Sequence, residues 1–174
     1  MTFPRLAYLL SRLAYLSAAV LALGWMFLVA QPLLFPGLIA PEIPAEAAGM
    51  VVHPLAYAAS RAVLVLVVAP AVCALIHAAQ LMHGFARGEV LTETAARHVR
   101  RIGVAILVRA ALMVPTQTAA VALLTITNPA GKRLLSVGVS SDLLEAVVYG
   151  GLLLLIAAAI QTGARAAAEN AEFV

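Results

Sequence analysis

Four long runs without a charged residue limit what this 174-residue chain can fold into. Residues 13–41, 62–86, 110–131 and 146–164 contain no Asp, Glu, Lys or Arg. A helix needs about 20 mainly apolar residues to cross roughly 30 Å of hydrocarbon. Since the backbone there must satisfy its own hydrogen bonds, such runs form helices. Charged residues make up 11% of the chain, far below the usual figure of about 25% for water-soluble domains. We predict an all-α integral membrane protein with four transmembrane helices.

The predicted spans cover about 13–35, 60–84, 102–126 and 143–162, and they form a single membrane domain over residues 1–174. We expect Gln31, Pro32 and Pro36 to close the first span, and a proline-rich loop to follow over 36–60. Pro70 lies inside the second span, where it is expected to bend the helix, and Pro115 lies near the middle of the third. The apolar run after Arg12 is longer than the core of a signal peptide, so we expect it to be retained as a membrane anchor.

The distribution of basic residues predicts the orientation of the spans. Seven lie in the N-terminus, the strip at 85–101 and the tail at 163–174, and three lie in the other two connections. Because cytoplasmic segments carry the excess of Lys and Arg, both termini and the strip are expected in the cytoplasm. The net charge of +3 therefore reflects membrane topology, and we expect no direct binding of nucleic acid.

The strip itself has features of a helix. In HGFARGEVLTETAARHVRRIG (83–103), Gly88 allows a turn, Thr92 can cap a helix, and Glu93 can pair with Arg97 one turn later. We therefore predict a short cytoplasmic amphipathic helix that continues into the third span. Two functions fit its charge: contact with anionic lipid headgroups, or docking of a cytoplasmic protein.

Two segments resemble a known family. GEVLTETAARHVRRIG between two spans, with ARAAAENAEFV at the end of the last, is similar to the bacterial family called domain of unknown function 2975. Leu91, Ala95 and Ala96 depart from its usual pattern. The resemblance implies a small four-helix protein of the bacterial inner membrane and, as partner, a small helix-turn-helix transcriptional regulator. The candidate partner-binding residues are Arg87, Glu89, Thr92, Glu93, Arg97, His98, Arg100, Arg101, Glu169 and Asn170.

Polar residues inside the spans form a second candidate group, because they are costly in hydrocarbon. Counted inward from the ends of the predicted spans, His77, Gln80, Arg109 and Gln161 lie at comparable depth and could form one interhelical polar belt. Alternatively, Arg109 extends its guanidinium to the headgroups and the others make ordinary interhelical hydrogen bonds. A third cluster, Thr116 to Thr118 with Glu145 and Tyr149, is expected toward the outer half.

The sequence shows no pattern of an enzyme. Of the four histidines, only His83 and His98 are expected to approach each other, at the water interface, so paired haem ligation is not predicted. We expect no cofactor and no metal. The sequence therefore favours a non-enzymatic inner-membrane protein that binds the lipid bilayer and, at its cytoplasmic face, a regulator. The alternative is a small transporter or permease subunit, although no acidic residue lies deep within a span.

Overall fold

The computed structural model describes residues 3–35, 53–129, 133, 135–138 and 141–171, and for 170 and 171 the backbone alone. In this part of the chain there are four helices, each long and apolar enough to cross a membrane. They are α1 (Phe3–Leu34), α2 (Pro54–Ala86), α3 (Glu93–Thr125) and α4 (Ser141–Ala171). The predicted all-helical architecture is confirmed. Most of the predicted loop at 36–60 lies outside the described residues.

The helices are longer than the predicted spans, because charge marks the edge of hydrocarbon and not the end of a helix. The first helix begins at Phe3, ten residues before the predicted span, and it continues through Pro32. Pro70 and Pro115 lie inside α2 and α3, as expected. The strip is not a separate helix: residues from Glu93 onward are the first turns of α3, which runs unbroken to Thr125.

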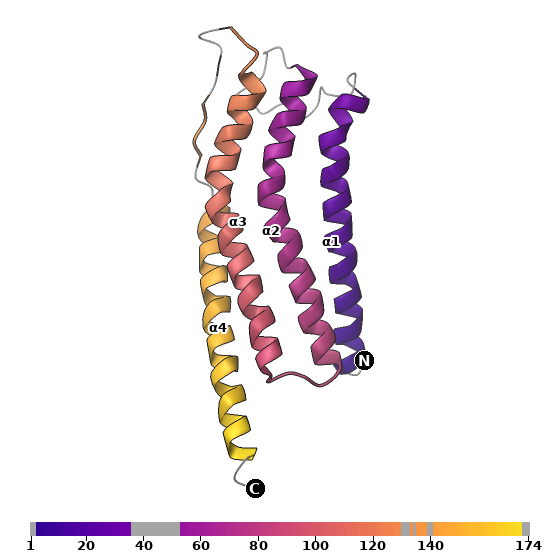
Figure 1. Ribbon diagram of the computed structural model, residues 1–174, viewed down its shortest axis with the longest axis vertical. Helices are drawn as coiled ribbons and strands as arrows, with labels where there is room; N and C mark the ends of the chain where they lie inside the picture. Colours follow the sequence, from indigo (N-terminus) through magenta and orange to yellow (C-terminus); the bar gives the residue numbers. More distant parts are fainter. Residues whose placement is uncertain (1–2, 36–52, 130–132, 134, 139–140, 172–174) are drawn as a thin grey trace.

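Consecutive helices pack side by side in chain order, α1 on α2, α2 on α3 and α3 on α4. Figure 1 shows the same order, with α1 and α4 on opposite sides. The N-terminus of α1, the turn between α2 and α3, and the C-terminus of α4 lie toward one end of the molecule (Figure 1). This common end is what the basic residues predict, although the structure contains no membrane to define the two sides.

Small residues form most of the buried core, and the large aliphatic side chains point outward. Alanines 7, 18, 56, 58, 79, 95, 96, 105, 110, 120 and 157 are buried. By contrast, large apolar residues such as Leu16, Val20, Leu23 and Leu155 are at least 60% exposed. Membrane helices pack in this way, because small residues let backbones approach while lipid covers the large side chains. A buried hydrogen bond from Ser11 Oγ to the carbonyl of Ala79, 2.9 Å long, joins α1 to α2.

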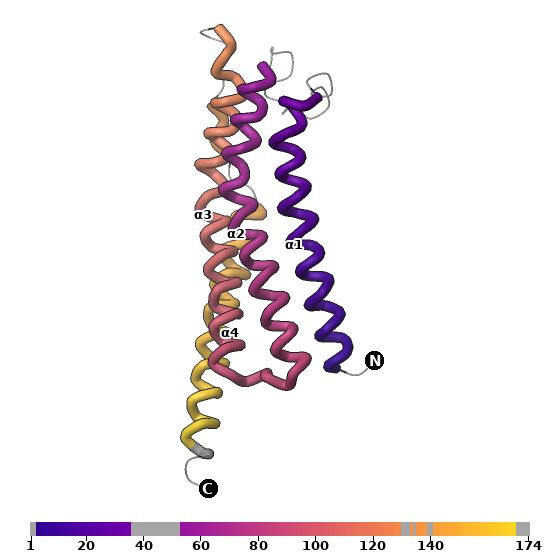
Figure 2. Tube along the Cα trace, turned by 45° about the vertical axis from the view of Figure 1, so that its right-hand side comes forward, coloured from indigo at the N-terminus to yellow at the C-terminus, as the bar shows by residue number. Residues whose placement is uncertain are grey.

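The contact between α3 and α4 is closest at two glycines. A methyl group added at Gly103 would lie 3.0 Å from the carbonyl oxygen of Gly150, and one added at Gly150 would lie 2.7 Å from Leu107 Cγ. This contact sets the register of α4, which begins part-way along α3 and extends beyond the other helices at its C-terminal end (Figures 1 and 2).

We predict that Gly150→Ala destabilises the protein by about 1–3 kcal/mol, because the methyl group overpacks the α3–α4 contact. The neighbouring Gly151→Ala is the matched control, since nothing lies within 4 Å of its added methyl group. In Gly151→Ala, alanine reduces the conformational freedom of the unfolded chain, so the free energy of unfolding should stay unchanged or rise. Thermal unfolding in detergent measures both. Equal effects of the two substitutions would show that the glycine contact does not hold α4 in place.

Candidate functional site at the arginine-rich end

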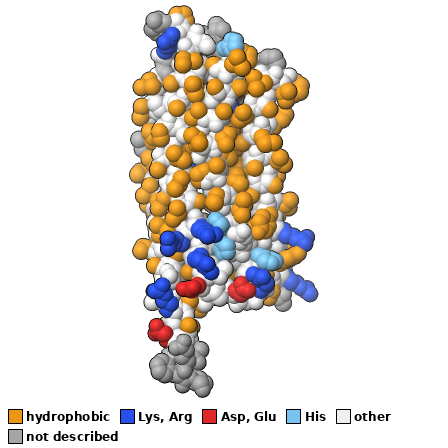
Figure 3. Space-filling model, in the orientation of Figure 1, with side chains coloured by type: hydrophobic (Ala, Val, Ile, Leu, Met, Phe, Trp, Pro, Cys, Tyr) orange, Lys and Arg blue, Asp and Glu red, His pale blue; other side chains and the backbone are white. Residues whose placement is uncertain are grey.

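Charged side chains gather at one end of the molecule, below a wide apolar band (Figure 3). We call this end the arginine-rich end and define it by Arg5, Arg12, Arg87, Arg97, Arg100, Arg101 and Arg165. These seven side chains are all exposed. They come from α1, from the turn after α2, from the first turns of α3 and from the last turns of α4. The fold thus brings to one end the seven basic residues that the sequence assigns to the cytoplasmic side.

A tight turn connects α2 to α3 at this end. Gly88 has a φ of 84°, in the left-handed region that glycine adopts readily, and the amide of Glu89 donates to the carbonyl of Gly84. Thr92 Oγ1 accepts from the amide of Ala95 at 3.1 Å, so the predicted cap is confirmed. Arg87 forms an ion pair with Glu89 at 3.3 Å.

The expected pairing of Glu93 with Arg97 is not found. Arg97 Nη2 donates instead to Thr94 Oγ1, at 3.3 Å. Glu93 is exposed, and within the described part of the chain no cation pairs with it. Its carboxylate remains available near the start of α3, where the positive end of the helix dipole stabilises negative charge.

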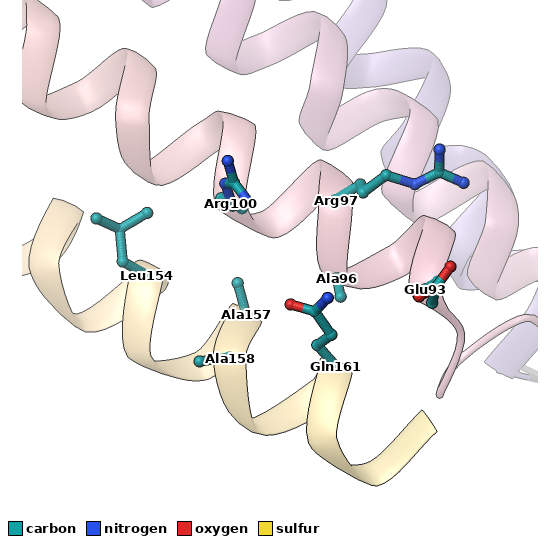
Figure 4. A pocket seen from close by; sticks show the side chains of 8 residues that line it. All are labelled: Glu93, Ala96, Arg97, Arg100, Leu154, Ala157, Ala158 and Gln161. Atoms are coloured by element: carbon teal, nitrogen blue, oxygen red, sulfur yellow. The ribbon is translucent and has the colours of Figure 1, made fainter. Parts of the chain in front are cut away.

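A groove of about 400 Å³ runs between the first turns of α3 and the middle of α4. We call it the α3–α4 groove; Figure 4 shows the residues that line it, which are Glu93, Ala96, Arg97, Arg100, Leu154, Ala157, Ala158 and Gln161. Ala96 and Ala157 are buried at its floor. The α3 side is charged, whereas the α4 side is apolar apart from Gln161, and Arg97 points away from α4 (Figure 4). The groove is therefore amphipathic.

The histidines meet in a different combination from the expected one. The ring centroids of His77 on α2 and His98 on α3 are 5.5 Å apart, whereas His83 lies against Tyr8 of α1 with the centroids 6.4 Å apart. The expected neighbours His83 and His98 line one pocket of about 350 Å³ at this end, although the ring of each lies against another residue. In the described part of the chain no group of three or more His, Cys, Asp and Glu residues could hold a metal ion.

The four residues of the proposed polar belt do not come together. His77 Nδ1 and Gln80 Oε1, one turn apart on α2, share a hydrogen bond of 2.9 Å, and Gln161 lies in the α3–α4 groove. Arg109 is exposed, and no bond joins it to another described residue. The comparison of depths fails because α3 begins at Glu93, so Arg109 is 16 residues from its helix end and His77 only 9 from the end of α2.

A cavity of about 410 Å³ with both polar and apolar lining lies toward the other end, between α2, α3 and the segment after α3. It contains Thr116 and Gln117, which the sequence singles out, together with Arg61, which it does not. Arg61 Nη2 donates to Tyr57 Oη at 2.6 Å, and its guanidinium lies over the Tyr57 ring. The spacing of four residues between Tyr57 and Arg61 is the signal that could have indicated this pair.

The remaining candidates lie on the last turns of α4. Glu169 is exposed, and the side chain of Asn170 is outside the described residues. Comparisons of the chain with protein-family models, with curated proteins and with solved structures find no match.

We predict that Arg109→Leu leaves the thermal stability of the detergent-solubilised protein unchanged or raises it, because an exposed arginine is replaced by an apolar side chain and no described partner is lost. Ser11→Ala is the comparison, since it removes a buried interhelical hydrogen bond and should cost about 0.6 kcal/mol or more. If Arg109→Leu destabilises the protein as much as Ser11→Ala does, Arg109 belongs to an interhelical network after all.

Proposed function

We propose that this chain is a non-enzymatic protein of the bacterial inner membrane, and that its arginine-rich end is a cytoplasmic surface that docks a soluble protein. The observation that carries the proposal is the position of α4. Its apolar middle turns lie beside the charged first turns of α3.

Contacts between the helices identify the residues at this level. The Gly103–Gly150 contact places Arg101 roughly level with Leu152, and the His77–His98 contact places it near Ala74 of α2. The hydrogen bond between Ser11 and Ala79 then places Leu16 of α1 at the same level. We propose that this level is the cytoplasmic edge of hydrocarbon.

All four helices are long enough to cross a bilayer, but they extend to different distances beyond this level. At 1.5 Å per residue, the parts of α1, α2 and α3 on the outer side measure about 28, 31 and 37 Å, close to or above the 30 Å that is needed. The corresponding part of α4, from Ser141 to Leu152, measures about 18 Å. Turns of α4 after Leu152 therefore lie at headgroup or water level.

Those turns are nevertheless apolar. Leu155 is 70% exposed, and Ile156 and Ala158 are exposed beside it. An exposed apolar patch bordered by charge is typical of a protein-interaction surface. Since the α3 side of the groove carries Arg97 and Arg100, we propose that the partner inserts an amphipathic helix with an acidic face.

The resemblance to domain of unknown function 2975 supports a specific kind of partner. It suggests a small helix-turn-helix regulator, which the membrane protein would hold at the cytoplasmic surface. The last turns of α4, with Arg165 and Glu169 exposed, extend the same surface beyond the other helices.

A photo-crosslinking residue tests the docking surface directly. Placed at Ala158 in the groove, it should crosslink a soluble protein that mass spectrometry identifies as a small DNA-binding regulator. Placed at Val148, which is 64% exposed on the outer side of α4, it should crosslink no soluble protein. Replacing Arg97, Arg100 and Arg101 together by Lys keeps the charge and the insertion but removes the planar guanidinium groups that bind carboxylates in pairs. We expect the crosslinked product to fall at least about fivefold.

Three results would contradict the proposal. Crosslinks from Ala158 to lipid alone would show that the α4 turns lie in the bilayer. A product of twice the mass of the chain would show that a second copy covers the groove. An undiminished crosslink in the Lys variant would show that the arginines act only through their charge.

A further inference from the structure

A second groove, between α2 and α3, shares Arg100 with the α3–α4 groove. It has a volume of about 670 Å³ and is lined by Leu66, Ala69, Pro70, Cys73, His77, Arg100, Arg101, Val104, Ala105 and Val108. We call it the α2–α3 groove. Its polar residues are at one end, and the remaining lining is apolar. No Asp or Glu is among the described residues that line it.

We propose that the α2–α3 groove is a binding site for one anionic glycerophospholipid of the inner leaflet. The phosphate would lie against Arg100 and Arg101, and one acyl chain would lie along the apolar part of the groove. This site goes beyond the proposed docking of a soluble protein, which uses the α4 side of α3.

The charge of the groove selects the headgroup. Arg100 and Arg101 are both exposed, and no bond joins either guanidinium to another described residue. Two neighbouring guanidinium groups without a carboxylate in the lining attract a phosphodiester strongly, and each contributes several donors to its oxygens. A zwitterionic lipid brings its own cation to the same place and loses part of this attraction. The groove should therefore prefer a lipid with a net negative charge.

The length of the groove fits the acyl chain. Along α3, Val108 lies seven residues after Arg101, a distance of about 10 Å. Along α2, Leu66 lies eleven residues before His77, a distance of about 17 Å. Half of a hydrocarbon core is roughly 15 Å. When the headgroup lies at the arginines, the acyl chain therefore lies along the groove through most of the depth of one leaflet.

A proline in α2 lies along the apolar part of the groove. Pro70 has no amide hydrogen and cannot donate to the carbonyl four residues earlier, which belongs to Leu66. Both residues line the groove, and between them Ala69 is small and exposed. The second helix therefore presents little side-chain bulk where the acyl chain would lie.

Native mass spectrometry of the whole protein in detergent tests the site, with phosphatidylglycerol and phosphatidylcholine of identical chains as probes. The wild-type protein should retain one phosphatidylglycerol more tightly than phosphatidylcholine. Arg100→Gln with Arg101→Gln should weaken retention of phosphatidylglycerol about 30-fold, at about a fivefold contribution from each charge near the lipid surface. Arg5→Gln with Arg165→Gln removes the same charge from the same end and should leave the retention unchanged.

A second variant tests the groove separately from the charge. Ala69→Leu fills the apolar part and should also release phosphatidylglycerol, whereas Ala62→Leu, at an exposed position of α2 outside the groove, should not. Equal retention of both lipids by the wild-type protein would overturn the proposal. So would equal losses in the two arginine pairs, or full retention in Ala69→Leu. None of these outcomes bears on crosslinking at Ala158, so the lipid site and the docking surface can fail independently.

Discussion

The absence of water in hydrocarbon is the constraint on which the rest of this structure depends. A peptide group left without a hydrogen bond there costs several kcal/mol, so each crossing segment becomes a helix. Lipid is as apolar as leucine, so burying large side chains gains little, and the helices associate through close packing instead. The buried alanines and the contact between Gly103 and Gly150 are the result. Many large apolar side chains, such as Leu16 and Leu155, are consequently left for the outer surface.

At the arginine-rich end, apolar and charged side chains lie next to each other. The fourth helix, α4, begins part-way along α3 and extends beyond the other helices at its C-terminal end (Figures 1 and 2). Its apolar turns around Leu155 therefore lie beside arginines instead of among apolar side chains. Two grooves border the first turns of α3, one toward α4 and one toward α2. In our account a soluble protein occupies the first and an anionic lipid the second, and Arg100 borders both.

Much of the fold could be predicted from sequence, because composition and local backbone chemistry determine it. The charge-free runs predict the four helices, and Thr92 and Gly88 act as their residue types suggest. The polar belt around Arg109 could not be predicted, because its depth was counted from charge boundaries while α3 begins nine residues earlier. The displacement of α4 and the contact between His77 and His98 depend on packing between helices, which no periodicity within one helix reveals.

The central claim is that the arginine-rich end faces the cytoplasm, and labelling of single cysteines measures this directly. Cys73 is the sole cysteine of the chain, so Cys73→Ala gives a background without thiols. Val90→Cys in the turn between α2 and α3, and Thr127→Cys after the end of α3, place one exposed thiol at each end. A membrane-impermeant maleimide added to intact spheroplasts should label Thr127→Cys at once, and Val90→Cys only after the membrane is disrupted. Labelling of Val90→Cys in intact spheroplasts would contradict the account.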